Sequence, residues 1–469
     1  MIPAAWVEAH LDAAGLLRRG RAGDGAPVAG GTADSRRVRA GDLFVALPGA
    51  RTDGHTHAGA ALAAGAAGAL LGDAARFDAL AAEHPGAALF LVPDPLAAAQ
   101  SLAAAHVAAV APAVVAVTGT NGKTGTKDLC RALLATLGPA HASEGNYNNL
   151  VGLPLTLLGL PEDTRYLVLE MGCSSFGEIE ALCRLFPPRV GIVTNIGAGH
   201  LEVLGDLDGV ARAKGELPAA LPADGLCVLN GDDPHTSALA ARTRAPVKRF
   251  GFGADNDLVA EDLGPAGPAS RRLRLEGREL TLPRPARHVL LNAAAAWLVA
   301  RHLGGEPAAL AAAAPGALRE ANRGALFRLG GVTVMDDSYN ANPDSLRAAL
   351  TWLSEAPAAG RRWAALGDML ELGEAGPALH RAAGEAAAAL GLDGLVATGP
   401  LSRELVAGAR AAGLASARHH DTIDALAADL AAALAPGDLL LVKGSRGMAM
   451  EGVLDALEAS LGRRREELR

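Results

Sequence analysis

The segment 118–128, TGTNGKTGTKD, constrains the fold of this chain more than any other stretch. A short apolar, β-branched run at 113–117 precedes it and predicts a buried strand. Apolar residues at helical spacing follow it over 129–137 and predict a helix. Strand, glycine-rich turn, Lys-Thr and helix is the arrangement of a phosphate-binding loop, which surrounds an anion with backbone N–H groups. We therefore predict an ATP site here, with Mg²⁺ beside the phosphates.

One position departs from the usual loop pattern, because Val117 stands where a glycine is expected, five residues before the Gly-Lys pair. The alternative is a glycine-rich turn that binds nothing, but the flanking strand and helix favour the phosphate loop. In such a loop Lys123 reaches the outer phosphates and the Thr124 hydroxyl meets Mg²⁺. The remaining nucleotide-binding candidates of the loop are Gly119, Thr120, Asn121, Gly122 and Gly125.

Length and composition limit the class of protein. A chain of 469 residues, half of them apolar, predicts two or three domains with large cores. A net charge of -8 gives no electrostatic reason to expect nucleic acid as a partner. Four cysteines without CxxC spacing suit a reducing compartment, and neither a signal peptide nor a membrane span is expected. We expect a cytoplasmic monomer.

The predicted fold class is α/β, in three domains. The first, residues 1–107, is a small α/β domain with strands at 42–47 and 89–92 and helices at 58–67 and 96–110. Its Asp34-Ser35-Arg36 segment either holds an anion through hydroxyl and guanidinium groups or is a solvated turn. The sequence alone leaves these two interpretations open.

The second domain, residues 108–315, is predicted to be a P-loop ATPase-like domain with a parallel sheet. Near-continuous apolar runs at 166–170, 190–194 and 226–230 predict strands that are covered on both faces. The carboxyl ends of such strands line a ligand crevice, so Glu170, Asn195 and Asp232-Asp233 are expected near the phosphate loop. The Arg-rich segment 254–285 alternates with leucine and predicts a β-hairpin, and a helix is expected at 288–303.

The third domain, residues 316–469, is predicted to be Rossmann-like, after a junction at 312–316. Strands are expected at 332–335, 363–366 and 439–442, with a helix that begins at Pro343. Asp336 and Asp337 follow a strand, where carboxylates either bind a ribose or cap the next helix. The charged tail 463–469 is expected to be frayed.

Three side chains outside the loop are candidates for catalysis. Glu170 ends an apolar strand, which is a reasonable place for a carboxylate that binds the Mg²⁺ of ATP. His200 lies in the glycine-rich segment 194–205, TNIGAGHLEVLG, and is either structural or a ligand. Lys214, in the segment 209–217, GVARAKGEL, is by default a solvated helix lysine.

The chain resembles the Mur ligase family of cell-wall precursor synthesis. TGTNGKT is that family's own variant of the phosphate loop. DDSYNANP (336–343) and LGDMLELG (366–373) resemble the member that joins D-alanyl-D-alanine to UDP-N-acetylmuramoyl-tripeptide, not those that add L-Ala, D-Glu or the third residue. Further matching stretches are GNYNNLVGLPLTLL (145–158), LVKGSRGMAME (441–451), TNIGAGHLE (194–202) and GVARAKGE (209–216).

The resemblance implies a mechanism. ATP phosphorylates the terminal carboxylate of the UDP-tripeptide, and the amine of D-alanyl-D-alanine attacks the acyl phosphate to give the amide, ADP and phosphate. It also implies that Glu170 and His200 hold metal ions and that Lys214 is carbamylated, which turns a cation into a carboxylate-like metal ligand. By the same resemblance Lys123 contacts the β- and γ-phosphates and Thr124 one Mg²⁺.

The resemblance assigns binding roles as well. Asn292 would contact adenine, Arg323 the γ-phosphate and Asp337 the ribose. Ser35 and Arg36 would hold the uridine diphosphate, and Asn149 and Thr156 the muramoyl region. The substrate site of the last domain would include Asn340, Asn342, Lys443, Ser445 and Arg446.

Two segments depart from the family pattern, and neither touches the phosphate chemistry. Val289 stands where the family often has Asn, which removes one polar contact near the adenine. Cys173, Ser174, Ser175 and Phe176 are an unusual filling of the loop after Glu170.

Other functions remain open at this stage. One alternative is another ATP-dependent amide ligase of the same fold, such as a folylpolyglutamate synthase or a different Mur ligase, but the DDSYNANP and LGDMLELG segments argue against it. A nucleotide-binding switch without catalysis would lack Glu170, His200 or Lys214. The third residue of the tripeptide, diaminopimelate or L-Lys, is left undecided.

Candidate residues lie on both sides of the junction at 312–316, so one reaction requires the last domain to close over the middle one. We expect an open form without ligand, and a compact form with ATP and UDP-tripeptide that turns on this junction.

Overall fold

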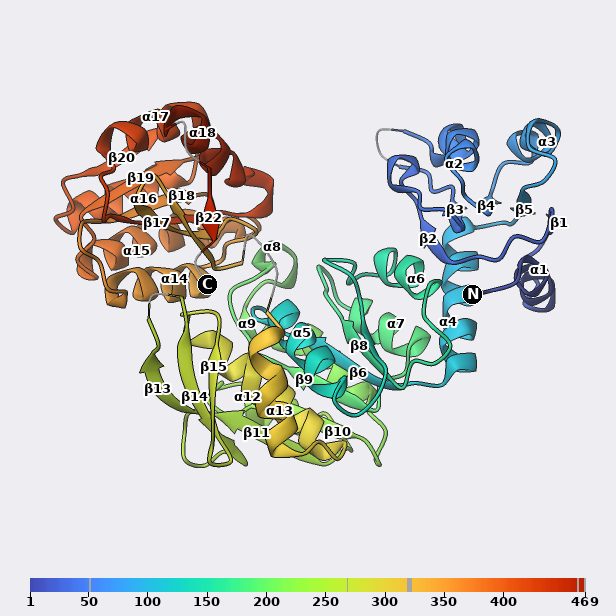
Figure 1. Ribbon diagram of the computed structural model, residues 1–469, viewed down its shortest axis with the longest axis horizontal. Helices are drawn as coiled ribbons and strands as arrows, with labels where there is room; N and C mark the ends of the chain where they lie inside the picture. The colour runs from blue at the N-terminus through green and yellow to red at the C-terminus, as the bar shows by residue number, and fades with distance from the viewer. Residues whose placement is uncertain (50–51, 268, 319–322, 462–463, 468–469) are drawn as a thin grey trace.

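The computed structural model describes residues 1–49, 52–267, 269–318, 323–461 and 464–467. Figure 1 shows three α/β units, with the middle one lying between the N-terminal unit in blue and the C-terminal unit in orange and red. None of the helices in these ranges has the length and apolar character needed to cross a membrane. The three-domain α/β architecture predicted from the sequence is therefore confirmed.

The first unit is a five-stranded sheet in the order β1-β5-β4-β3-β2, parallel except for β1. All four predicted elements are present, although the helix expected at 58–67 ends at Ala63. It ends early because the N–H groups of Gly65 and Ala66 bond back to the carbonyls of Leu62 and Ala61. The elements are α1 (Ala4–Ala13), β1 (Arg19–Arg21), β2 (Gly30–Thr32), η1 (Ser35–Arg37), β3 (Asp42–Val45), η2 (Gly54–His57), α2 (Ala58–Ala63), β4 (Gly68–Leu71), α3 (Ala74–Glu83), β5 (Ala88–Leu91) and α4 (Pro95–Val110).

Helix α4 connects the first unit to the middle one. Asp94 caps it by accepting from the N–H groups of Leu96 and Ala97 at 2.8 and 3.1 Å, and Pro95 occupies its first turn. The helix continues through residue 107, where the domain division was predicted. Its buried face belongs to a core that contains both Val7 of the first unit and Val114 of the middle unit. The first two units therefore share apolar packing, and the division at 107 stays a prediction.

The middle unit is built on a parallel sheet in the order β12-β11-β10-β9-β6-β8-β7. Val115 and Val117 of β6 pack toward α5 and α12, whereas Val114 and Ala116 pack toward α4. The sheet is covered on both faces, as the apolar runs predicted. The elements are β6 (Ala113–Thr118), α5 (Lys123–Leu134), β7 (Ala140–Ala142), α6 (Gly152–Leu157), β8 (Tyr166–Glu170), α7 (Glu178–Leu185), β9 (Val190–Val193), α8 (Leu201–Leu204), α9 (Leu207–Lys214), α10 (Glu216–Ala220), β10 (Leu226–Asn230), α11 (Thr236–Ala240), β11 (Val247–Gly251), β12 (Leu258–Val259), α12 (His288–His302), α13 (Pro307–Ala313) and η3 (Ala314–Gly316).

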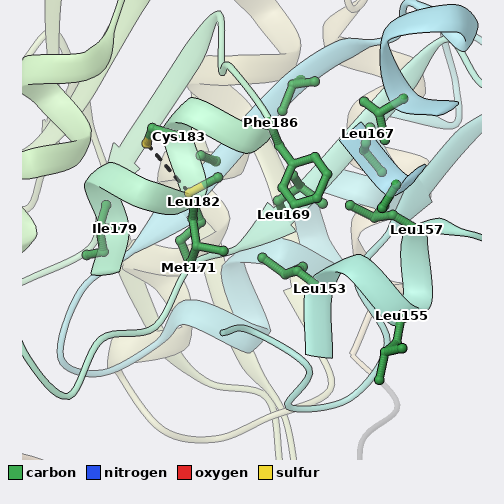
Figure 2. Close-up of a cluster of buried hydrophobic side chains, with 14 of the residues drawn as sticks. Leu153, Leu155, Leu157, Leu167, Leu169, Met171, Ile179, Leu182, Cys183 and Phe186 are labelled. Carbon is green, nitrogen blue, oxygen red and sulfur yellow. Dashed lines mark hydrogen bonds between the residues drawn. The ribbon is translucent and has the colours of Figure 1, made fainter. Parts of the chain in front are cut away.

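Strand β8 is held by an apolar cluster that fixes its last residue, Glu170. Figure 2 shows side chains of α6 and α7 gathered over Leu167 and Leu169 of β8. Met171 continues the cluster beyond the strand, and its Sδ lies 3.8 Å from Cys183 Sγ of α7. Because Leu169 and Met171 are both fully buried, the intervening Glu170 has little freedom to move.

The segment predicted to form a β-hairpin is a three-stranded antiparallel sheet, β13 (Glu261–Pro265), β14 (Arg271–Leu275) and β15 (Arg278–Leu282). The predicted hairpin is β14 and β15, joined by Glu276 and Gly277 at φ 46° and 76°. The alternating leucines, of which Leu273 pairs with Leu280, are buried as expected. Strand β13 was not predicted.

The C-terminal unit is a sheet in the order β20-β19-β18-β21-β17-β16-β22, parallel from β20 to β17 and antiparallel at β16 and β22. The three predicted strands and the helix that begins at Pro343 are confirmed. The elements are β16 (Ala325–Leu329), β17 (Val332–Asp337), α14 (Pro343–Glu355), β18 (Arg362–Gly367), η4 (Gly373–Ala375), α15 (Gly376–Ala389), β19 (Gly394–Thr398), α16 (Ser402–Ala411), β20 (Ala417–His420), α17 (Ile423–Ala433), β21 (Leu439–Lys443), η5 (Arg446–Met448), α18 (Glu451–Leu461) and β22 (Glu466–Glu467).

Two segments of this half of the chain are more ordered than the sequence predicts, and the domain division at 315 stays a prediction. The junction expected at 312–316 is the end of α13 followed by η3, and Ala314 is buried in the core of the middle unit. The Ala-Pro-Gly run continues the helix as a 3₁₀ turn, so these residues do not form a free linker. The tail, expected to be frayed, pairs through β22 with Phe327 and Arg328 of β16, while 463 and 468–469 lie outside the described residues.

Helices α15 and α16 approach each other closely at glycines. A Cβ atom on Gly384 would overlap the carbonyl oxygen of Leu405, and one on Gly408 would overlap that of Arg381. Since the obstacle is backbone, it is not relieved by a change of side-chain rotamer. The two helices can pack at this distance only without side chains at these positions.

We expect Gly384→Ala to destabilise the C-terminal unit by about 1–3 kcal/mol or more, because the methyl group forces the two helices apart. Calorimetry should show a lower midpoint for thermal unfolding of this unit. Gly376→Ala in the same helix is the control, since its methyl group would meet Leu401 Cδ1 at an ordinary 3.5 Å. Equal midpoints for the two variants would contradict the packing argument.

Candidate active site

A cleft of about 720 Å³ lies where the middle and C-terminal units meet. The phosphate loop, the end of β8 and the loop after β9 line one side, and the segments around Asn340 and Ser445 line the other. Of the predicted site residues, Gly119, Thr124, Ser35, Arg36 and Thr156 are not among those that line it. Those that do are Thr120, Asn121, Gly122, Lys123, Gly125, Asn149, Glu170, His200, Lys214, Asn292, Arg323, Asp337, Asn340, Asn342, Lys443, Ser445 and Arg446.

The phosphate loop has the conformation that its glycines predict. Gly119 and Gly122 have φ of 140° and 80°, values that favour glycine, and α5 begins directly after them at Lys123. Asn195 after β9 anchors the loop, because its Oδ1 accepts from Asn121 N at 2.9 Å and its Nδ2 donates to Asn121 O at 3.0 Å. The predicted strand, loop and helix are confirmed, as is the predicted position of Asn195 beside the loop.

The Lys123 side chain folds back over the phosphate loop. Its Nζ donates to the carbonyls of Gly119 and Thr120 at 2.9 and 3.0 Å. Burial, together with the nearby charge of Lys214, lowers the pKa of Lys123 to about 8. A desolvated cation among oriented backbone groups is suited to binding a phosphate.

Glu170 is held from both sides. Its Oε2 accepts from the Thr124 hydroxyl at 2.7 Å and its Oε1 from Asn148 Nδ2 at 2.8 Å. A hydroxyl and one carboxylate are donors that Mg²⁺ takes in nucleotide sites, where phosphate oxygens and water complete the shell. In the described ranges no group of three or more His, Cys, Asp and Glu side chains forms a protein-only metal site. The residues present therefore fit a Mg²⁺ ion that arrives with a nucleotide.

His200 faces the C-terminal unit. Its backbone has φ 55°, and its Nδ1 lies 2.7 Å from Glu371 Oε2 across the cleft. Burial lowers the pKa of His200 against the opposing effect of Glu371. The histidine therefore contributes to the contact between units, and its role as a metal ligand stays a prediction.

Lys214 is not the solvated lysine that its helix predicts, because only 3% of it is exposed. Its Nζ lies 3.8 Å from Cys173 Sγ, one of the residues in which the loop after Glu170 departs from the family pattern. Burial lowers the pKa of Lys214. A lowered pKa increases the fraction of neutral amine, which is the form that adds CO₂ to give a carbamate.

On the side of the cleft that the C-terminal unit forms, Lys443 links two neighbouring segments, and its side chain is 2% exposed. Its Nζ lies 2.5 Å from Asp337 Oδ2 and donates to the carbonyl of Asn340 at 2.8 Å. Asp336 accepts from the Ser338 hydroxyl, and the cap of α14 is Asn342. The idea that Asp336 or Asp337 caps this helix was therefore wrong.

Two candidates for nucleotide binding border the loop. Asn292 of α12 packs so closely against it that a Cβ atom on Gly122 would overlap its amide. Val289 on the same helix is buried and lines the cleft. The guanidinium of Arg323 lies 3.8 Å from the ring centroid of Tyr339, a residue to which sequence reasoning assigned no role.

Comparison with known proteins identifies the family. The chain matches the model of the Mur ligase middle domain over residues 117–300 and that of the Mur ligase glutamate ligase domain over 322–446. Residues 27–107 match the model described as the Mur ligase family catalytic domain. This chain belongs to the Mur ligase family.

Individual relatives agree. The chain is 39% identical to the UDP-N-acetylmuramoyl-tripeptide–D-alanyl-D-alanine ligase of Mycobacterium bovis over 91% of both chains. It is 34% identical to that of Bacillus subtilis, over 91% of this chain and 93% of the relative. The crystal structure of MurF from Acinetobacter baumannii matches with a TM-score of 0.80 at 28% identity, over 92% of this chain and 93% of the other.

Two further structures bear on nucleotide binding and on the fold. MurF ligase from Thermotoga maritima in complex with ADP has a TM-score of 0.77 at 28% identity, over 93% of this chain and 98% of the other. A UDP-N-acetylmuramoyl-L-alanyl-D-glutamate–2,6-diaminopimelate ligase has a TM-score of 0.51 at 19% identity, over 92% and 95% of the chains, and shows the fold alone.

Of the residues of this Mur ligase predicted to bind the UDP-substrate, Asn149 lines the cleft, whereas Ser35, Arg36 and Thr156 do not. Arg36 is 87% exposed and pairs with Asp34 at 2.8 Å, which lowers the pKa of Asp34 to about 2. Asn149 Oδ1 accepts from Gly152 N, at the first residue of α6, at 2.8 Å, and the Thr156 hydroxyl donates to the carbonyl of Leu153 in the same helix. The roles of Ser35, Arg36, Asn149 and Thr156 in binding UDP-substrate stay predictions.

Sequence reasoning missed two links to the segment GNYNN. Arg37 Nη1 donates to the Tyr147 hydroxyl at 2.7 Å and joins the first unit to the middle one. Asn148, next in sequence, holds Glu170. The resemblance pointed to this segment, but it gave no way to tell which Asn faces the carboxylate.

We expect Lys123→Ala to lower turnover at least ~10²-fold, because it removes the cation that meets the outer phosphates. The fold should persist, since the hydrogen bonds that Lys123 Nζ makes to described residues are to two carbonyls of the loop. Phosphate release from ATP measures turnover, and circular dichroism checks the fold. Lys248→Ala, which removes an exposed lysine from β11, is the control and should retain wild-type turnover. Near-normal turnover of Lys123→Ala would disprove the nucleotide assignment.

Proposed function

We infer that this Mur ligase joins D-alanyl-D-alanine to UDP-N-acetylmuramoyl-tripeptide at the expense of ATP, in the synthesis of peptidoglycan precursors. The observation that carries this inference is the cleft, where Lys123, Glu170 and Lys214 of the middle unit face the DDSYNANP segment and Lys443 of the last unit. The relatives that share 34–39% identity over nine-tenths of the chain carry the name of this activity.

The chemistry has two steps. The terminal carboxylate of the tripeptide attacks the γ-phosphorus of ATP, so ADP leaves and an acyl phosphate forms. The amine of D-alanyl-D-alanine then attacks the acyl carbon, and the tetrahedral intermediate collapses to an amide as inorganic phosphate leaves and the amine loses a proton. The protein positions the groups and neutralises phosphoryl charge, and Lys123 and the loop N–H groups are placed to do so.

Mg²⁺ would be held by Thr124 and Glu170, with His200 and carbamylated Lys214 as further ligands. When bound, it supplies neutralisation of charge on the transferred phosphoryl group. Asn148 keeps the Glu170 carboxylate in place, and Arg323 and Asp337 would contact the phosphates and ribose. Asn340, Lys443, Ser445 and Arg446 would form the substrate site of the last unit. A cytoplasmic location and a monomeric state stay predictions.

Phosphate release from ATP should require both the UDP-tripeptide and D-alanyl-D-alanine. Assays with the diaminopimelate and L-Lys tripeptides side by side should show which one is the substrate, by its higher kcat/KM. Omission of D-alanyl-D-alanine is the control and should leave no sustained release. Equal release without the dipeptide would indicate an ATPase and contradict the proposed ligase.

Lys214→Ala should nearly abolish turnover, because the metals need an anion at this place and the alanine cannot be carbamylated. Added short-chain carboxylates should restore part of the activity by entering the space that the lysine leaves. The control is Arg212→Ala, which removes an exposed cation from the same helix, α9. Its turnover should equal that of the wild type, both with and without added carboxylate. Full activity of Lys214→Ala without additive would show that the lysine has no part in the reaction.

A further inference from the structure

The side chain of Asn342 makes contacts in two units at once. As the cap of α14, its Oδ1 accepts from Ser345 N at 2.9 Å, and the Ser345 hydroxyl accepts from Asn342 N at 3.1 Å. Its Nδ2 donates to Asn121 Oδ1 at 2.7 Å, and Asn121 Nδ2 donates back to Asn342 Oδ1 at 3.2 Å. The helix cap of the last unit is thus bonded to the phosphate loop of the middle unit.

The backbone of Asn121 is already fixed within its own unit. Asn195 bonds both its N–H and its carbonyl, and the Thr194 hydroxyl donates to the same carbonyl at 2.6 Å. The side chain of Asn121 therefore extends from a rigid loop toward α14. Because the loop is rigid, a hydrogen bond from this side chain to α14 forms only when the last unit has one position relative to the loop.

A second contact lies at the same end of α14. Asp344 Oδ2 accepts from Ala198 N at 3.2 Å, and a Cβ atom on Gly197 would overlap this carboxylate. The Thr120 hydroxyl of the phosphate loop accepts from Gly197 N at 2.9 Å. The start of α14 is thus connected to the phosphate loop twice, directly at Asn121 and through the 197–198 segment at Thr120.

We propose that the amide pair Asn121–Asn342 sets the register in which the C-terminal unit docks on the phosphate loop, and that Asn342 is a positioning residue for phosphoryl transfer. This rests on the proposed function. An amide has a donor and an acceptor side, so two amides satisfy each other in one relative orientation. When the units separate, Asn342 still caps α14 and water satisfies Asn121. When they dock, Asp337 and Lys443 are brought into register with Lys123.

Asn342 then has a different role from the one that the family resemblance implies. The resemblance placed it in the substrate site, but its polar atoms are engaged by Asn121 and by the backbone of its own helix. It acts on the reaction through Asn121. A double-mutant cycle separates such a coupling from a loss of substrate contact, because residues in one hydrogen-bond network show non-additive effects, whereas the effects of independent sites add.

The test uses Asn342→Ser, Asn121→Ala and the double variant in the full-length enzyme. Serine still caps the helix but is too short to reach Asn121. We expect Asn342→Ser to lower kcat about tenfold or more in the wild-type background. In the Asn121→Ala background the same change should alter kcat by less than about twofold. Ser345→Ala weakens the same helix cap without touching Asn121, and should leave kcat within about twofold of the wild type.

A second readout does not require turnover. X-ray scattering with ATP and UDP-tripeptide should show a fall in the radius of gyration for the wild type and for Ser345→Ala, and a smaller fall for Asn342→Ser. An equal loss of kcat on Asn342→Ser in both backgrounds, or full compaction of this variant, would overturn the proposal. Failure of the ligase assignment would be seen separately, as wild-type phosphate release that does not depend on both substrates.

Discussion

The site depends on three adjacent parallel strands of the middle sheet, whose carboxyl ends lie side by side. Strand β6 leads into the phosphate loop, β8 ends in Glu170, and β9 leads into Asn195. Because the strands are neighbours in register, the hydrogen bonds from Thr124 to Glu170 and between Asn195 and Asn121 form without long side chains. The apolar cluster around Leu169 and Met171 keeps β8 at the depth that these bonds require. Loss of that packing would displace the Glu170 carboxylate, even though none of the apolar side chains contacts a ligand.

The three lysines that line the cleft, Lys123, Lys214 and Lys443, differ in how their charge is balanced. Burial lowers the pKa of both Lys123 and Lys214, and the charge of Lys214 further lowers the pKa of Lys123. Two desolvated ammonium groups near one another are unfavourable without counter-ions. Phosphates would offset Lys123, and a carbamate on Lys214 would replace a repelling cation by an anion. Lys443 differs, because Asp337 already neutralises it.

Much of the fold was predictable, because its signals are local. The apolar runs predicted β8 and β10 at their observed bounds, and Pro343 marked the start of α14. Interactions between distant residues were not predictable from periodicity. Lys214 reads as a solvated lysine on its helix, and only the fold buries it beside Cys173. The run 312–316 has a linker composition, yet Ala314 packs into a core formed by residues far away in sequence.

In the candidate site, too, residues with a local sequence signal were predictable and those defined by tertiary contacts were not. Motifs pointed to Lys123, Glu170 and Lys443, whose side chains carry the charge that the chemistry needs. The residues that hold such groups carry amides or hydroxyls, and their partners depend on tertiary structure. Asn148, between two other asparagines of GNYNN, is distinguished only by its bond to Glu170.

The contacts between the middle and C-terminal units suit a surface that opens and closes. Asn121–Asn342, Ala198–Asp344 and His200–Glu371 are polar pairs, and each group finds water as a partner when the units separate. Hydrogen bonds exchanged for water contribute about 0.5–1.5 kcal/mol each, so a few of them set an orientation without locking it. Leu201 adds an apolar contact to the cores of both units. An interface of this kind is specific in geometry but modest in energy, which allows substrates that bridge the cleft to decide how long it stays closed.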